Sequence, residues 1–85
     1  MADVVMYKTL VCPYCSMAGA LLKKKGVSWR EVDVTFDAAL RQEMEERSGR
    51  RTVPQIVIDD VSVGGYDDLV RLDRAGELDQ LLGLV

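Results

Sequence analysis

Both cysteines of this chain lie in one short segment, Cys12-Pro13-Tyr14-Cys15, between an apolar run and a stretch with helical spacing. The N-terminus of a helix carries unpaired N–H groups and a partial positive charge, and both stabilise a thiolate. Pro13 suits the first helical turn, where its missing N–H loses no hydrogen bond. The segment therefore predicts a redox pair in which Cys12 attacks a disulfide and Cys15, one turn further along, resolves the product.

Two structural roles for these cysteines agree less well with the sequence. A structural zinc site is usually built from four Cys or His ligands, whereas this chain has two cysteines and no histidine. A purely structural disulfide between Cys12 and Cys15 would close a loop too small to constrain the unfolded chain strongly. We therefore expect thiol–disulfide chemistry and no metal site.

The length and composition indicate an ordinary globular protein. Its 85 residues, 48% apolar and 29% charged, suffice for one modest core, so we expect a single domain over residues 1–85. The formal net charge of −3 argues against nucleic acid as a general partner. There is no apolar run long enough to cross a membrane and no secretory leader before the first apolar run. We therefore expect a cytoplasmic protein, in a reducing compartment, without a membrane partner.

Short apolar runs alternate with helical spacing along the chain. Strands are expected at residues 4–7, 27–34, 55–59 and 61–63, and helices at residues 13–25, 37–48, 66–76 and 77–82. Asp37 suits the N-cap of the second helix, and Gly26 and Gly49 suit the ends of the first two helices. Pro54 is tolerated only at the very start of its strand, because it has no N–H to donate.

The order of these elements predicts the fold class. The first two strands and the helix between them form a βαβ unit, which is right-handed in nearly all proteins. The Asp59-Asp60 turn then makes the last two strands an antiparallel hairpin. The complete order, βαβ-α-ββ-α, predicts an α/β protein of thioredoxin-like architecture, with a four-stranded mixed sheet and helices on both faces.

Three motifs occur along the chain: Cys12-Pro13-Tyr14-Cys15, Thr52-Val53-Pro54-Gln55 and Gly64-Gly65-Tyr66-Asp67-Asp68-Leu69. Together, at these separations, they resemble the dithiol glutaredoxins of bacteria, and the resemblance covers essentially the whole chain. It implies a glutathione-dependent disulfide oxidoreductase that reduces glutathione mixed disulfides and protein disulfides through a dithiol–disulfide cycle of the two cysteines. Glutathione is the implied reducing co-substrate.

The resemblance also implies a binding site for glutathione. In the family the proline matching Pro54 is cis and lies opposite the cysteines, which leaves the backbone of Val53 free to pair with an extended thiol peptide. The amides of Tyr66 and Asp67, at a helix N-terminus, receive the γ-glutamyl carboxylate, and an aspartate receives the ammonium group. The implied binding residues are Tyr14, Arg41, Arg51, Thr52, Val53, Pro54, Gly65, Tyr66, Asp67 and Asp68.

The basic residues of this site depart from the family pattern at one position. In the family, basic or amide side chains at positions matching Arg41 and Arg51 meet the glycyl carboxylate, and arginine can grip a carboxylate with two parallel N–H bonds. A lysine usually stands three residues before the first cysteine, but this chain has Thr9 there and Lys8 one place earlier. Strand alternation then points Lys8 to the opposite face, unless the chain has already left the strand at this point. We therefore expect the two arginines, more than Lys8, to supply the positive charge.

Two other functions fit parts of the pattern. A glutaredoxin-like hydrogen donor reduced by thioredoxin reductase would use the same cysteines, but the glutathione-contacting motifs would then be superfluous. An iron–sulfur scaffold would hold a [2Fe–2S] cluster between two protomers and two glutathiones, but cluster-binding relatives usually carry a smaller residue at the position of Pro13. The expected partners are glutathione and glutathionylated or disulfide-containing proteins, with ribonucleotide reductase as one candidate, and the expected state is a monomer.

Overall fold

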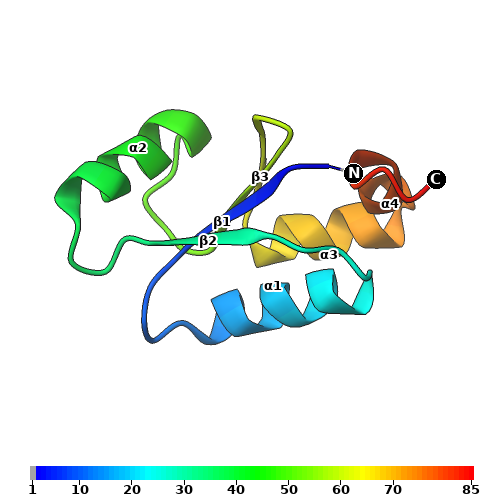
Figure 1. Cartoon of the computed structure of the whole chain (residues 1–85), viewed down its shortest axis with the longest axis horizontal. Helices are drawn as coiled ribbons and strands as arrows, with labels where there is room; N and C mark the ends of the chain where they lie inside the picture. The colour runs from blue at the N-terminus through cyan, green and yellow to red at the C-terminus, as the bar shows by residue number, and fades with distance from the viewer. Residues whose placement is uncertain (1) are drawn as a thin grey trace.

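The structure, a computed structural model that describes residues 2–85, has the predicted strands and helices in the predicted order (Figure 1). The elements are β1 (Val4–Lys8), α1 (Pro13–Lys24), β2 (Arg30–Asp33), α2 (Ala38–Ser48), β3 (Gln55–Ile58), β4 (Val61–Gly64), α3 (Tyr66–Arg74) and α4 (Glu77–Leu81). Strand β2 begins later than predicted, at Arg30 and not at residue 27. The reason is local, because the Val27 N–H donates to the Leu22 carbonyl at the end of α1 and is not available to a strand.

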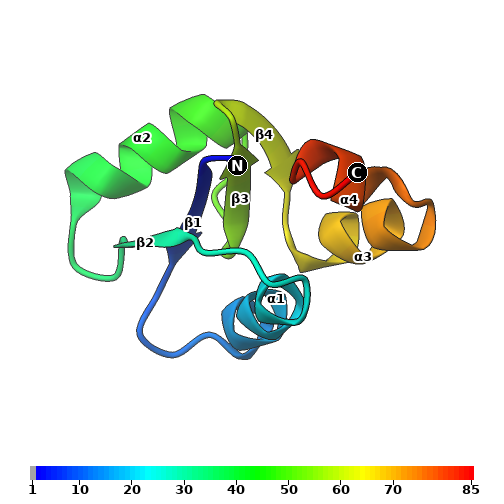
Figure 2. The ribbon, with the colours of Figure 1, turned by 45° about the vertical axis from the view of Figure 1, so that its right-hand side comes forward.

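The sheet is mixed, as predicted, with strand order β2-β1-β3-β4. Strand β1 is parallel to β2 and antiparallel to β3, and β3 and β4 form the predicted antiparallel hairpin. Because β1 and β2 are parallel, the loops that follow them leave the sheet at the same end, on the left in Figures 1 and 2. This connection places the cysteine segment, which follows β1, beside the loop that follows β2.

Helices cover both faces of the sheet (Figure 2). Met6 packs on one face in a cluster with Leu22 of α1 and Leu69 of α3. Its neighbour Tyr7 packs on the other face in a cluster with Met44 of α2. Residues 4–7 of β1 are therefore buried on both sides, which explains why these four residues do not alternate with charged ones.

Helix α2 is highly charged, and a polar network holds it to the sheet in addition to Met44. The Tyr7 hydroxyl donates to Glu43 Oε2 at 2.6 Å and accepts from Arg47 Nη1 at 2.8 Å. Burial, followed by the hydrogen bond to Glu43, raises the pKa of Tyr7 above its ordinary value. Asp37 caps the helix through the Leu40 N–H, as predicted, and Gly49 ends it with a left-handed backbone.

No helix within residues 2–85 is both long enough and apolar enough to cross a membrane.

Candidate active site

Cys12 is the N-cap residue of α1. Its backbone is extended, Pro13 begins the helix directly after it, and its Sγ accepts a hydrogen bond from the Cys15 N–H at 3.1 Å. This N–H is one of the unpaired donors at the helix start, so the local geometry places a hydrogen-bond donor against the sulfur, where it stabilises a thiolate. The sequence prediction that the helix starts at Pro13 is confirmed.

The two cysteines are bonded to each other and differ in exposure. Cys12 and Cys15 form a disulfide, with Cα atoms 5.1 Å apart. Cys15 is buried and belongs to the core cluster between α1 and the sheet, whereas Cys12 is half-exposed. A disulfide partner arriving from solvent therefore reaches Cys12 first, and Cys15 is placed to attack from beneath.

The segment before β3 lines the same cavity as Tyr14, which stands between the two cysteines in the sequence. The Val53–Pro54 peptide bond is cis, which the family resemblance implied. Within residues 2–85 the backbone N–H and C=O of Val53 form no hydrogen bond. An N–H and a C=O that are both free are the groups with which an extended peptide pairs.

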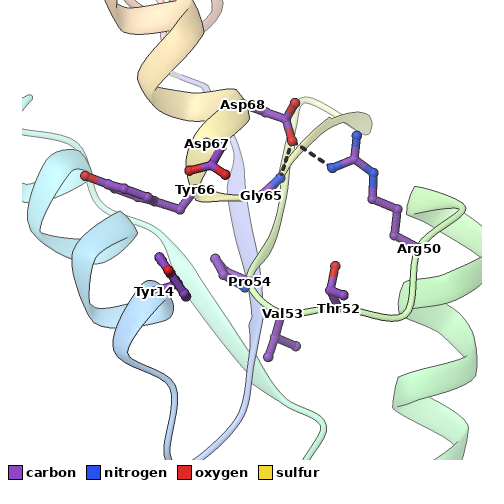
Figure 3. A pocket seen from close by; sticks show the side chains of 9 residues that line it. All are labelled: Tyr14, Arg50, Thr52, Val53, Pro54, Gly65, Tyr66, Asp67 and Asp68. Carbon is purple, nitrogen blue, oxygen red and sulfur yellow. Dashed lines mark hydrogen bonds and ion pairs between the residues drawn. The ribbon is translucent and has the colours of Figure 1, made fainter.

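A cavity of about 190 Å³ lies beside the cysteines, between this segment and the start of α3 (Figure 3). Its lining residues are Tyr14, Arg50, Thr52, Val53, Pro54, Gly65, Tyr66, Asp67 and Asp68. The rings of Tyr14 and Tyr66 lie side by side, with centroids 6.2 Å apart. The structure thus brings together all the binding residues implied by the resemblance except Arg41 and Arg51.

Two glycines allow α3 to approach the cis-proline segment. A Cβ on Gly65 would lie 3.2 Å from the Pro54 carbonyl oxygen, which is tighter than ordinary contact. Gly64 has φ of +109°, which disfavours other residues, and a Cβ there would overlap the Asp68 side chain. Gly65 therefore allows α3 to approach the cis-proline segment closely, and Gly64 leaves room for the Asp68 side chain.

The two neighbouring aspartates lie in different environments. The Asp68 carboxylate is buried and accepts from the Gly65 N–H at 2.9 Å, Arg50 Nη1 at 2.7 Å and Arg71 Nη2 at 2.8 Å. The hydrogen bond from Arg50, followed by that from Gly65, lowers the pKa of Asp68 to about 2. Asp67 is exposed at the cavity, so its carboxylate is the one accessible to a ligand.

Arg50 is a residue of this site that sequence reasoning missed. It lines the cavity and reaches Asp68, as Figure 3 shows. The signal in the sequence is the pair Arg50-Arg51, of which the resemblance implies only Arg51 as a binding residue. These residues lie outside helices and strands, so no periodicity indicated which of the two faces the cavity.

The two predicted arginines lie outside the cavity lining. Arg51 is exposed, and its Nε pairs with Glu45 Oε1 at 3.0 Å. Arg41 Nη2 donates to the Val34 carbonyl at 3.3 Å. Their assignment to a carboxylate of glutathione stays a prediction. Both side chains are long, and each makes a single side-chain hydrogen bond among the described residues, so a ligand has only one such bond to replace at each arginine.

A second hollow, of about 380 Å³, lies on the other side of the cysteines along α1. Both cysteines line it together with Lys8, whose Nζ lies 3.6 Å from Glu31 Oε1. The expectation that Lys8 points to the face opposite the site is therefore wrong. Lys8 is the last residue of β1 and has the same orientation as Met6, toward the face that α1 covers.

No group of three or more His, Cys, Asp or Glu side chains within residues 2–85 is arranged to hold a metal ion.

Residues 4–63 match the family model described as glutaredoxin. Glutaredoxin 3 of Escherichia coli is 55% identical over 82 residues, which cover 96% of this chain and 99% of that protein. A glutaredoxin of Pseudomonas aeruginosa is 49% identical over 82 residues, covering 96% and 98%.

Solved structures give the same result. The solution structure of glutaredoxin from Brucella melitensis has 52% identity and a TM-score of 0.85, covering 96% of this chain and 89% of that one. The crystal structure of a buckwheat glutaredoxin–glutathione complex has 25% identity and a TM-score of 0.88, covering 96% and 77%. These matches confirm the predicted thioredoxin-like fold. With its redox-active dithiol at the start of α1, the chain belongs to the glutaredoxin family of thiol–disulfide oxidoreductases.

Proposed function

We propose that this protein is a glutathione-dependent oxidoreductase that reduces glutathione mixed disulfides and protein disulfides through Cys12 and Cys15. The observation that carries the proposal is the cavity beside the disulfide, where a free backbone edge at Val53 faces the helix start at Tyr66. Such a cavity suits an extended peptide with a thiol in its middle and a carboxylate at one end. Glutathione has this chemistry, and a buckwheat relative with this fold was crystallised with it.

Each part of glutathione has a proposed partner. Its cysteine pairs with the backbone of Val53 and so places its sulfur next to Cys12. Its γ-glutamyl carboxylate binds the N–H groups of Tyr66 and Asp67 at the start of α3, where the helix dipole favours negative charge. The exposed Asp67 carboxylate pairs with the ammonium group. Arg41 and Arg51 supply positive charge for the glycyl carboxylate, after their side chains reorient.

The proposed reaction is two successive thiol–disulfide exchanges. The Cys12 thiolate attacks the glutathione sulfur of a mixed disulfide, the S–S bond breaks, and the other thiol leaves with its electron pair and takes up a proton. Glutathione is now bonded to Cys12. If a second glutathione attacks this bond as a thiolate, the two glutathiones leave together as a disulfide and Cys12 is free again. If the Cys15 thiolate attacks instead, the Cys12–Cys15 disulfide forms and the first glutathione leaves as a thiol. When Cys15 attacks, two further glutathiones reduce the Cys12–Cys15 disulfide and leave as oxidised glutathione.

The substrates and the setting follow from this cycle. Because glutathione regenerates the dithiol, the protein would act in a reducing compartment, which we propose to be the cytoplasm. Glutathionylated proteins and disulfide-containing enzymes are the proposed partners, and ribonucleotide reductase remains one candidate among them.

The test is a disulfide reduction assay with two alternative sources of electrons. Glutathione with glutathione reductase should support rapid turnover of a glutathione mixed disulfide, whereas thioredoxin reductase with NADPH should support little. Cys12→Ser should be inactive in both arms. Turnover with thioredoxin reductase but not with glutathione would replace this proposal by the hydrogen-donor alternative. An absorbance band of an iron–sulfur cluster in anaerobically purified protein would instead favour the scaffold.

A further inference from the structure

Three large apolar side chains are exposed next to the reactive end of α1. Leu10 is 64% exposed, Val11 89% and Phe36 90%. None of them belongs to either core cluster, so the fold does not use them for packing. A single exposed apolar side chain is ordinary on a protein surface, but several together mark a surface that meets a partner. We call Leu10, Val11 and Phe36 the apolar patch.

A hydrogen-bonded connection holds the members of the apolar patch together, although they come from two loops. The Leu10 N–H donates to Thr35 Oγ1 at 2.8 Å, and this ties the loop after β1 to the loop after β2. The Thr35 hydroxyl and N–H both donate to Asp33 Oδ1, at 2.5 Å and 2.8 Å. Phe36 directly follows Thr35, and Val11 directly follows Leu10.

The position of the apolar patch determines what meets it. Val11 directly precedes Cys12, so a polypeptide joined to Cys12 by a disulfide passes close to the patch. The cavity proposed for glutathione is lined by Tyr14, the segment before β3 and the start of α3, and by no member of the patch. Glutathione bound in that cavity therefore leaves the patch uncovered, whereas a longer chain attached at Cys12 covers it.

We propose that the apolar patch binds the residues next to the reactive cysteine of protein substrates, and that it selects disulfides flanked by large apolar side chains. This inference rests on the proposed function, because it names the protein substrates of the same reaction. The patch contributes no charge, so it gains free energy by removing apolar surface of the partner from water. The bonds through Thr35 hold both loops in place before binding, which lowers the entropy lost when the partner docks.

The test compares two peptides with the same ring formed by an internal disulfide. One has leucine and phenylalanine beside the cysteines, and the other has serine and glutamine. Each rate is divided by the rate of reduction by dithiothreitol, which corrects for intrinsic differences between the disulfides. We expect the wild type to have a kcat/KM about tenfold higher for the apolar peptide, and Leu10→Ser/Phe36→Ser to reduce this preference to about twofold or less.

Two controls make the comparison specific. Reduction of a small glutathione mixed disulfide should be unchanged in Leu10→Ser/Phe36→Ser, because neither residue lines the glutathione cavity. Val61→Ser removes an equally apolar, 57% exposed side chain at the far end of the sheet and should keep the preference. If the double variant lost activity on the small substrate, the single variants Leu10→Ser and Phe36→Ser would be compared in its place.

Several results would overturn the inference. It is wrong if the wild type does not prefer the apolar peptide, or if the preference survives in the double variant. It is also wrong if sedimentation shows a wild-type dimer that the double variant dissociates, since the patch would then bind a second copy of the chain. Failure of the wild type on the small glutathione mixed disulfide would be a different result, because it would reject the proposed function itself.

Discussion

Arg50 and Asp68 form an ion pair across the candidate glutathione cavity, with Nη1 2.7 Å from Oδ2 (Figure 3). The pair joins the segment before Pro54 to the first turn of α3, two parts of the chain that must lie at a fixed separation to hold one ligand. Asp68 also accepts the Gly65 N–H at the start of the helix. The same carboxylate thus caps α3 and fixes the position of the opposite wall.

Arg50→Met should weaken glutathione binding through this connection. Asp68 would keep its bonds to Gly65 and Arg71, but the two walls would no longer be linked. We expect the KM for a glutathione mixed disulfide to rise about three- to tenfold with a smaller change in kcat, because a half-exposed ion pair contributes modestly. Steady-state kinetics at varied substrate concentration measures both constants.

Arg71→Met is the matched control for this prediction. Arg71 bonds the other oxygen of Asp68 but does not line the cavity. It should lower the free energy of unfolding by an amount similar to Arg50→Met and leave the KM almost unchanged. Equal increases in KM for both variants would mean that loss of the Asp68 charge balance, and not the link across the cavity, weakens binding.

The acid stability of the protein should depend on Asp68. Its pKa is about 2 in the folded protein against an ordinary value of 3.8, mainly because of Arg50. A carboxyl group whose pKa is lower in the folded than in the unfolded state stabilises the fold at every pH above its unfolded pKa. This contribution disappears as the pH falls from about 4 to about 2. Denaturant unfolding should show that Asp68→Asn lowers the free energy of unfolding at pH 6, and that up to about 2 kcal/mol of this difference disappears near pH 2.

Asp67→Asn is the control for the acid-stability prediction, because Asp67 is exposed and lies next to Asp68 in the sequence. It should lower the free energy of unfolding at pH 6 by less than Asp68→Asn does, because an exposed carboxylate contributes little to stability. If the difference between Asp68→Asn and the wild type were the same at pH 6 and near pH 2, the ionised form of Asp68 would not be the stabilising species.

Arg41 and Arg51, the two arginines predicted to bind the glycyl carboxylate, can be tested in one double variant. Neither lines the cavity in this structure. Arg41→Ala/Arg51→Ala should raise the KM for a glutathione mixed disulfide about three- to tenfold. Each exposed arginine contributes a small binding free energy to the glycyl carboxylate, and the double variant loses both contributions. Lys8→Ala should have a smaller effect, since Lys8 pairs with Glu31 on the other side of the cysteines. Kinetics at low and high salt should show the arginine effect shrinking at high salt.

Arg30→Ala provides the control for charge in general. Arg30 is 71% exposed and pairs weakly with Asp3 at 3.5 Å, at the start of β2 and away from the cysteines. It should leave the KM unchanged. A larger increase from Lys8→Ala than from the double arginine variant would assign the glycyl carboxylate to Lys8.

The fold was largely predictable because its boundaries are set by local chemistry. Pro13 at the start of α1, Asp37 at the N-cap of α2 and Gly49 at its end are residues whose backbone preferences act within a few positions. The start of β2 was less predictable, because the apolar Val27 suits a strand but packs at the end of α1. Its place depends on contacts between segments, which a sequence pattern does not contain.

The candidate site was predictable where motifs fix the backbone and less so where long side chains decide. The residues around Pro54 and Gly65 line the cavity because the close approach of Gly65 to the Pro54 carbonyl brings their main chains together. Arg50 and Arg51 are adjacent, and only the three-dimensional arrangement shows that Arg50 reaches Asp68 while Arg51 pairs with Glu45. The orientation of Lys8 was predicted wrongly for a related reason, because it depends on the residue at which β1 ends.

The last prediction separates the tasks of the two cysteines. Cys12 is half-exposed at the helix start, and Cys15 is buried beneath it, so only Cys12 is accessible to an incoming disulfide. Cys15→Ser should retain most activity on small glutathione mixed disulfides, because a second glutathione can release the first from Cys12. It should lose activity on protein disulfides, whose reduction needs an internal thiol to free the enzyme. Cys12→Ser should lose both activities.

The same division of tasks predicts a trapped intermediate. In Cys15→Ser under mild oxidation, glutathione bonded to Cys12 cannot be displaced internally, so intact-mass analysis should find one added glutathione per chain. Cys12→Ser should carry none on the buried Cys15 under the same conditions. If Cys15→Ser, with its circular dichroism unchanged, lost reduction of small mixed disulfides as completely as Cys12→Ser, release by a second glutathione would be excluded and Cys15 would be required in every turnover.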